Sequence, residues 1–147
     1  MLEYVKEKNR AKAIVQKHPW GCGAACVAFM LGLDYSATLK LFTHGTRKAN
    51  HSGFYCREII NVLNRYNGNY RYKYIKYKIK RRIYKDHTLV FIGRSSQYPI
   101  GHYLCRYQDT WMDPWINFSK NKNIKEAKAG FRKRLPARSI YAILLIP

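Results

Sequence analysis

Apolar residues recur at helical spacing in the first half of the chain and in strand-like runs in the second half. The helical spacing predicts three helices, which run from Cys22 to about Leu33, from Ser36 to about Phe42, and from Phe54 to Tyr66. We expect Ser36 to cap the second of these helices. The polar, turn-rich segment 44–53 between the second and third helices is predicted to be a loop.

The second half of the chain is typical of a sheet. Strands are predicted at 70–75, 88–93, 101–107, 110–113 and 139–146. The dipeptide Gln108-Asp109 closes a tight hairpin between the third and fourth of these strands, and the continuous apolar run 139–146 favours an interior position in the sheet. Helices followed by an antiparallel sheet indicate an α+β fold, and the length of 147 residues suits one domain over residues 1–147.

The composition limits the setting of the protein. There is no apolar run of about 18 residues and no apolar core of a signal peptide, so we expect no membrane span and a cytoplasmic location. The four cysteines are therefore expected to be reduced. The formal net charge of +20 predicts attraction to polyanions such as nucleic acid or acidic proteins. Residues 1–15 are interpreted as a basic lead-in without a functional role.

The stretch around Cys22 is the strongest candidate for chemistry. Pro19 and Gly21 end any preceding helix, which puts the Cys22 thiol in the first turn of a new one. The free backbone N–H groups and the dipole at that end favour the thiolate, the nucleophilic form of cysteine. Gln16, six residues upstream, could direct a side-chain N–H to the same point.

The predicted hairpin supplies the other two groups that a cysteine nucleophile needs. His102 begins one strand and Asp113 ends the next, so antiparallel pairing brings them to the same end. The imidazole would take the thiol proton, and the carboxylate would orient the imidazole. Asp109 is the competing carboxylate. An alternative in which Cys22, Cys26 and a histidine bind zinc is weak, because the Cys-x3-Cys spacing lacks a second tight pair. We expect neither a metal nor a cofactor.

These motifs together resemble a known family. Gln16, the run Gly21-Cys22-Gly23-Ala24-Ala25-Cys26, Gly101-His102-Tyr103-Leu104 and Asp113-Pro114 are similar to the papain-like cysteine peptidases that process bacteriocin leaders after a double-glycine motif. The resemblance covers about residues 14–115. It implies a papain-like fold, with the nucleophile at a helix N-terminus packed on an antiparallel sheet, in a stand-alone and divergent member.

The resemblance also implies roles for individual residues. Cys22 would be the nucleophile, His102 the general base and acid, Asp113 the orienting carboxylate and Gln16 the oxyanion donor, acting on a peptide or protein. Substrate contacts are expected from Trp20, Gly21, His51 and Gly101. The chain departs from the family pattern at Gly21, where an acidic residue is usual, and in its shorter hairpin. Acyl transfer or deamidation would use the same thioester chemistry.

A binding function is the alternative from another class. Between residues 70 and 85, tyrosines alternate with the basic residues Arg71, Lys73, Lys76, Lys78, Lys80, Arg81 and Arg82. Such interleaving suits single-stranded nucleic acid, although a solvated strand face is the favoured interpretation. A second basic segment spans 119–135, where only Glu126 is acidic. On this alternative the chain is a catalytically divergent scaffold that binds nucleic acid or a host protein, as an accessory protein of a phage or mobile element would.

Overall fold

The computed structural model describes residues 4–5, 7–8, 11–66, 68–119 and 121–146. Within these residues the helices come before most of the sheet: α1 (Cys22–Leu31), α2 (Tyr35–Leu39), α3 (Gly45–His51) and α4 (Cys56–Asn64). The strands are β1 (Tyr4–Val5), β2 (Glu7–Lys8), β3 (Ala11–Lys12), β4 (Tyr70–Tyr74), β5 (Leu89–Ile92), β6 (His102–Tyr107), β7 (Thr110–Asp113), β8 (Gly130–Arg132) and β9 (Ser139–Leu145). Short 3-10 turns lie at Arg82–Tyr84 and Ile124–Glu126.

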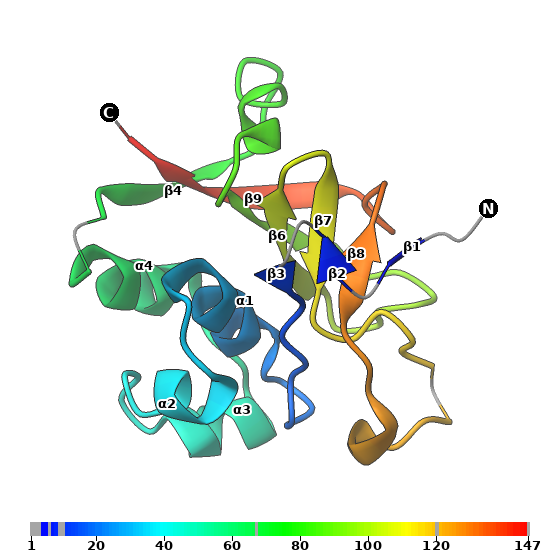
Figure 1. The fold of residues 1–147 in the computed structure, drawn as a ribbon. Coiled ribbons are helices and arrows are strands. Elements are labelled where there is room, and N and C mark those ends of the chain that lie inside the picture. Colours follow the sequence, from blue (N-terminus) through cyan, green and yellow to red (C-terminus); the bar gives the residue numbers. More distant parts are fainter. Residues whose placement is uncertain (1–3, 6, 9–10, 67, 120, 147) are drawn as a thin grey trace.

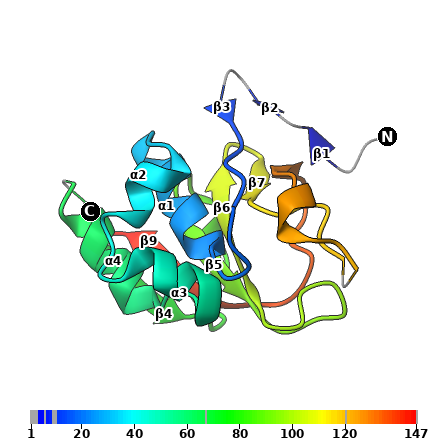
Figure 2. The same cartoon turned by 90° about the horizontal axis from the view of Figure 1, so that it is seen from below.

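The main sheet of the described residues has the order β1-β8-β7-β6-β5-β9-β4, and β2 pairs separately with β3. Every neighbouring pair in it is antiparallel. The four helices gather on one side of this sheet (Figures 1 and 2). The predicted α+β class is therefore confirmed. β9 lies inside the sheet, as its apolar run predicted, between β5 and the edge strand β4.

Alternation along the strands divides the core into two clusters. One cluster joins the helices to the sheet and includes Leu89, Cys105 and Ile143, and the other contains Val90, Leu104 and Ala142. Because successive strand residues face opposite sides, β5 and β9 are buried on both faces. This double burial explains why these two strands are continuous apolar runs.

The second face of the sheet is covered partly by the basic segment between β4 and β5. Ile75, Ile79 and Ile83 pack against the cluster on this face. In Figure 1 this green segment extends past the sheet on the side away from the helices. The segment is therefore a cover anchored by isoleucines at every fourth position, and the strand within the predicted basic region ends at Tyr74.

α1 is buried around most of its circumference. Its residues from Gly23 to Ala28 are all buried, whereas Phe29 and Met30 are only half-buried. Small side chains allow this close packing, since a Cβ on Gly23 would lie 3.1 Å from Ile59 Cδ1. Placing the first turn of α1 against α4 and the sheet holds Cys22 at a junction between the two layers.

Two predictions about the second helix are wrong. Asp34, not Ser36, caps α2, because its carboxylate accepts a hydrogen bond of 2.6 Å from the Ala37 N–H. The helix also ends at Leu39, and the chain reaches Phe42 through turns.

The predicted loop at 44–53 is instead mostly α3. Its backbone is tied to the Cys22 stretch by the bond from Trp20 N to Ala49 O (2.8 Å), and Ala49 is fully buried. The Lys48 ammonium pairs with Glu58, the carboxylate that also accepts the Tyr55 N–H at the start of α4. These contacts with distant residues stabilise a helix that the local polar sequence does not indicate.

The first 15 residues contribute strands that the sequence pattern did not predict. β1 pairs with β8, and β2 pairs with β3. Leu2 and the other residues of 1–3, 6 and 9–10 lie outside the described residues. Of the helices that are described, none has the length and apolar character needed to cross a membrane.

Candidate active site

Cys22 is the first residue of α1. The preceding Gly21 makes no side-chain cap, and no acidic residue lies in the first turn. The thiol is partly exposed and borders a cavity. Uncapped N–H groups and the positive end of the helix dipole therefore surround the thiol without a competing carboxylate in that turn.

Gly21 is required because another side chain takes the space of its Cβ. A Cβ at this position would lie 2.0 Å from the Tyr35 hydroxyl. That hydroxyl contacts His18 Nδ1 at 2.9 Å, while Gly21 N donates to the His18 carbonyl at 3.0 Å. Tyr35 of α2 thus braces the turn that leads into Cys22, which gives a physical reason for glycine where the resembling family usually has an acidic residue.

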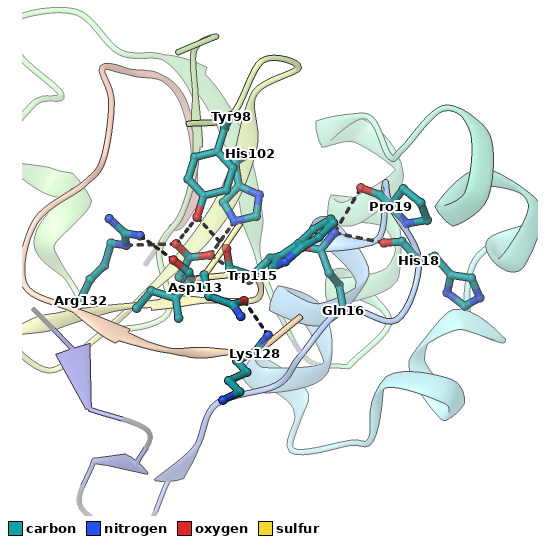
Figure 3. A network of polar contacts seen from close by, with 11 residues as sticks. Gln16, His18, Pro19, Tyr98, His102, Asp113, Trp115, Lys128 and Arg132 are labelled. Atoms are coloured by element: carbon teal, nitrogen blue, oxygen red, sulfur yellow. Dashed lines mark hydrogen bonds and ion pairs between the residues drawn. The ribbon is translucent and has the colours of Figure 1, made fainter. Parts of the chain in front are cut away.

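Gln16 is buried and holds the same turn from the other side. Its Nε2 donates to the carbonyl oxygens of His18 (3.1 Å) and Pro19 (3.2 Å), as Figure 3 shows. Its backbone N–H donates to Pro114 O, next to Asp113. An amide nitrogen carries two hydrogens, so both hydrogens of the predicted oxyanion donor Gln16 are directed at backbone carbonyls. Its Oε1 is buried without a partner among the described groups.

His102 and Asp113 meet as the hairpin predicted. In the hairpin register Cys105 lies opposite Met112, which makes His102 and Asp113 diagonal neighbours on one face. The His102 Nε2 is 2.6 Å from Asp113 Oδ1, and both residues are buried. Since Asp113 occupies Nε2, the nitrogen left for a proton from another group is Nδ1.

The carboxylate of Asp113 has more partners than the sequence suggested. The Tyr98 hydroxyl donates to its Oδ2 at 2.8 Å, and the Trp115 backbone N–H donates to Oδ1 at 2.9 Å. Arg132 Nε lies 3.0 Å from Oδ2 as an ion pair, but its N–H is not aligned for a hydrogen bond. Figure 3 shows these groups converging on Asp113 from separate segments. Burial alone would raise the pKa of Asp113, but His102, Arg132 and the Trp115 N–H outweigh burial and lower it. The carboxylate of Asp113 therefore stays charged although it is fully buried.

The environment of His102 favours the imidazolium form. Burial alone lowers the pKa of His102, but the Asp113 carboxylate and then the Cys22 thiol raise it, to about 9. The contribution from Cys22 indicates that the thiol lies within interaction range of the ring. Cys22 and His102 also line the same cavity. The predicted nucleophile and base are therefore neighbours in space although 80 positions apart in the sequence.

The cavity has a volume of about 560 Å³ and is lined mainly by aromatic rings. Gln16, Cys22 and His102 are among the polar residues that line it. Arg57 also lines it, and this side chain is exposed. The aromatic lining comes from Trp20, Phe54, Tyr55, Tyr72, Phe91, Tyr98, Tyr103, Trp115, Phe118 and Tyr141. A space of this size, with a thiol and an imidazole in its lining, can hold a short extended peptide.

Two of the four predicted substrate contacts lie at this cavity. Trp20 and Gly101 line it, whereas Gly21 and His51 are not among the described residues that do so. Gly101 has φ +83° and lies so close to Phe91 that a Cβ would approach its ring at 2.4 Å. His51 ends α3 and is exposed, while the adjacent Ser52 and Gly53 border the cavity instead.

No sequence pattern marks Tyr98, Trp115 or Arg132 as site residues. Tyr98 falls in the segment between β5 and β6, where no pattern marks a buried side chain. Arg132 belongs to the basic segment 119–135 that was interpreted as a run of charge, of which Lys120 lies outside the described residues. Its half-buried position becomes evident only when β8 pairs with β7.

The seven basic residues proposed to bind a polyanion are all exposed: Arg71, Lys73, Lys76, Lys78, Lys80, Arg81 and Arg82. Arg71 and Lys73 lie on the edge strand β4, and the others lie on the cover between β4 and β5. Exposed cations on an edge strand are an ordinary means of keeping it soluble. A binding role for them stays a prediction.

The remaining thiols differ from Cys22 in their surroundings. Cys26 and Cys105 are fully buried, and burial raises the pKa of both. Cys56 is partly exposed in the cavity wall, where burial also raises its pKa and its sulfur lies 3.5 Å from the Tyr103 hydroxyl. All four thiols are free. Among residues whose placement is described, no group of three or more histidines, cysteines and carboxylates is arranged to hold a metal ion.

Comparison with known proteins supplies a fold relationship. No family model and no curated protein matches the sequence. The peptidase domain of Streptococcus ComA, a bifunctional ABC transporter involved in a quorum-sensing pathway, matches the structure with a TM-score of 0.56 and 17% identity, over 94% of this chain and 99% of that one. A double-glycine motif protease from an AMS/PCAT transporter, solved with its leader peptide, matches with a TM-score of 0.48 and 15% identity, over 100% and 99% of the two chains. The papain-like fold that the motifs indicated is thus confirmed, and this chain has the fold of the ComA peptidase domain.

Proposed function

We propose that the protein is a cysteine peptidase that acts on peptide or protein substrates. The observation that supports this most directly is the arrangement of three groups: the Cys22 thiol and the His102 imidazole line one cavity, and the buried Asp113 carboxylate pairs with His102. The likeness in fold to a peptidase domain is consistent with this chemistry. Function resides in the site, so the arrangement of these side chains supports the proposal more strongly than the fold does.

The proposed reaction starts from a thiolate–imidazolium pair, in which the proton of the Cys22 thiol has passed to His102 Nδ1. The thiolate sulfur then attacks the carbonyl carbon of the scissile peptide bond, which forms a C–S bond and a tetrahedral oxyanion. Collapse of this intermediate breaks the C–N bond, and the imidazolium donates its proton to the departing amine. Water, deprotonated by His102, releases the acyl group from the thioester and regenerates the thiol.

Asp113 and Gln16 would assist without forming covalent bonds. Asp113 holds His102 through Nε2 and stabilises the imidazolium that forms in the first step. The oxyanion would bind the Cys22 backbone N–H together with the Gln16 amide, which exchanges one of its backbone carbonyl partners for the substrate oxygen. An acyl transferase or deamidase would share the thioester and differ in the group that accepts or leaves.

The pH dependence of alkylation tests the proposal. Intact protein is treated with iodoacetamide between pH 5 and 10, and the modified thiols are identified by peptide mass spectrometry. We expect Cys22 to react well below pH 8.5, and to lose this reactivity at least tenfold in His102→Ala, because the imidazole no longer accepts its proton. Cys56 is an internal control, since it lines the same cavity and burial raises its pKa. A Cys22 that reacts only alongside Cys56 at high pH would refute the peptidase.

Hydrolysis itself is tested with a mixture of peptides from a digested proteome. The wild-type chain should generate new amino termini that are absent with Cys22→Ala, and their flanking sequences would define the substrate. New termini that persist in Cys22→Ala would show that another nucleophile or a contaminant is responsible. A wild-type chain with an activated thiol but no new termini would favour acyl transfer or deamidation over hydrolysis.

A further inference from the structure

Tyr98 contacts both the imidazole and the carboxylate of the candidate triad. Its ring stacks on His102 with centroids 4.1 Å apart and planes inclined by 5°. Its hydroxyl donates to Asp113 Oδ2 at 2.8 Å and also lies 2.8 Å from the Trp115 carbonyl. One buried side chain therefore restrains the plane of the imidazole and the rotation of the carboxylate together (Figure 3).

The backbone around Tyr98 fixes where this side chain can lie. Tyr98 N donates to Ser95 Oγ, and Ser95 N donates to Tyr98 O, both at 3.0 Å. Gly101 N donates to the same Tyr98 carbonyl at 3.1 Å, and Gly101 adopts φ +83°, which glycine tolerates best. The ring also stacks on Phe118 at 5.4 Å. A turn with this much local bonding presents the side chain in one orientation.

We propose that Tyr98 is a positioning residue that sets both the orientation and the basicity of His102. This inference rests on the proposed function, because it assigns Tyr98 a part in activating Cys22. The ring keeps the imidazole in the plane in which Nε2 meets Asp113 and Nδ1 remains free for the thiol. The hydroxyl holds Asp113 so that Oδ1 is directed at His102.

The two parts of Tyr98 act on the charge of His102 in opposite directions. A tyrosine ring stacked on an imidazolium favours the charged form through its π-electrons. The hydroxyl draws negative charge on Asp113 toward itself, which weakens the attraction between Asp113 and the imidazolium. Burial and the nearby Asp113 charge raise the pKa of Tyr98, so the hydroxyl remains a donor throughout the neutral range.

Other titratable or charged groups reach the pair from several elements. Cys22 of α1 interacts with His102, Cys26 of α1 interacts with Asp113, and Arg132 of β8 pairs with Asp113 Oδ2. Arg132 shares its carboxylate oxygen with the Tyr98 hydroxyl. When the Tyr98 hydroxyl is removed, Asp113 keeps its ion pair with Arg132 and remains charged. A Tyr98→Phe variant therefore isolates the effect of one neutral hydrogen-bond donor.

Two variants at this position separate the contributions. Tyr98→Phe keeps the ring and removes the donor, and Tyr98→Leu removes both. The pKa of His102 is measured in the full chain by NMR titration of its ring carbon, with His102→Ala identifying the signal. Relative to wild type, we expect the pKa of His102 to rise by about half a unit in Tyr98→Phe. Relative to Tyr98→Phe, we expect it to fall by about half a unit or more in Tyr98→Leu, because the ring is lost as well.

Alkylation of Cys22 gives the functional readout. At pH 7 we expect Tyr98→Leu to slow the reaction about tenfold, because a less restrained imidazole accepts the thiol proton less often. Tyr98→Phe should keep the alkylation rate of Cys22 at pH 7 within about threefold of wild type. It should also shift the high-pH part of the alkylation profile to higher pH, following the raised pKa of His102. A tyrosine that served packing alone would lower stability in both variants without shifting either profile.

Tyr107 supplies matched controls. It packs its ring against Phe29 and Phe131 at the far end of β6 and does not line the cavity. Tyr107→Phe and Tyr107→Leu should leave the pKa of His102 and the alkylation profile unchanged, even where they reduce stability. An unshifted His102 in both Tyr98 variants, with Cys22 activated in the wild type, would overturn the inference alone. An unactivated Cys22 in the wild type would overturn the proposed function and the inference together.

Discussion

At the scale of single residues, the stretch that leads into Cys22 is fixed by side chains on both of its flanks. Gln16 bonds the carbonyls of His18 and Pro19, and Tyr35 contacts the His18 ring. Local sequence accounts for the break before the helix, because Pro19 and Gly21 interrupt helical bonding. It does not account for the partner of Gly21, since Tyr35 approaches from the next helix.

Gln16 can be tested for its oxyanion role separately from its bracing role. Alkylation by iodoacetamide forms no tetrahedral oxyanion, whereas peptide hydrolysis does. We expect Gln16→Ala to lower kcat for peptide cleavage by about 10²-fold and to leave the alkylation profile of Cys22 near that of wild type. Parallel losses in both assays would contradict the oxyanion role and indicate that the amide acts by holding the turn.

The pH dependence of stability reports on the His102–Asp113 pair. The pKa of His102 is raised from 6.5 to about 9 in the folded chain, so the folded state binds the extra proton between these values. This contribution is fully present below pH 6.5 and is lost as the pH rises through about 9. We expect the free energy of unfolding to fall by up to about 3 kcal/mol over that window.

Urea unfolding at half-unit steps from pH 6 to 9 measures this decline. His102→Gln is the control, because it retains a polar side chain that does not titrate. The difference between wild type and variant should narrow as the pH rises. A difference that is constant or that widens toward pH 9 would contradict a raised pKa for His102.

At the scale of elements, the helices are positioned by contacts between segments that are distant in the chain. α3 forms where the local sequence is polar because Lys48 pairs with Glu58 and the Ala49 carbonyl accepts from Trp20. Tyr35 of α2 fits closely against Gly21, the residue before the first turn of α1. This fit can be tested through Gly21 and Tyr35.

Gly21→Ala should destabilise the chain by about 1–3 kcal/mol, because its Cβ would lie 2.0 Å from the Tyr35 hydroxyl. Tyr35→Phe removes that oxygen and leaves the next ring atom at 3.1 Å. The double variant should therefore be more stable than the sum of the two single changes predicts, by about 1 kcal/mol or more. Chemical denaturation of the four proteins measures this coupling.

Gly32→Ala is the control for this cycle. It also replaces a helix-flanking glycine, but its Cβ would meet nothing within 4 Å, and its cost arises from φ +69° alone. Its effect should simply add to that of Tyr35→Phe. Additivity for Gly21→Ala as well would show that the turn relaxes away from Tyr35 at little cost.

At the scale of the whole molecule, the chain combines a formal net charge of +20 with a cavity that is lined largely by aromatic side chains. The basic residues between β4 and β5 are exposed while the isoleucines among them face the sheet. The same segment thus covers a core face and presents charge outward. Attraction to polyanions stays a prediction, and a positive surface of this kind would produce it without a dedicated binding site.

We expect any binding of a fluorescent single-stranded oligonucleotide to weaken steeply between about 50 and 200 mM salt, and to show no sequence preference. Replacing Arg71, Lys73 and Lys76 by glutamine should reduce binding no more than replacing Lys122, Lys125 and Lys128. Fluorescence anisotropy with both triple variants measures this. Affinity that resists salt, or that depends on the first triple alone, would favour the nucleic-acid-binding alternative.

The sequence by itself determined the elements whose signals are local. Pro19 and Gly21 set the start of α1 at Cys22, the apolar runs fixed β5 and β9, and the two-residue turn brought His102 to Asp113. In each case the deciding interactions join residues that are close in the chain or paired by one hairpin, so periodicity and turn chemistry were sufficient.

Only the tertiary structure decided what surrounds those groups. The polar segment of α3, the stacking of Tyr98 on His102 and the ion pair of Arg132 with Asp113 all depend on residues from separate elements. A sequence pattern records which side chains are apolar or charged, but it does not record which distant partner neutralises a charge or fills a space. Burial of Asp113 among such partners therefore emerged only when the strands were assembled.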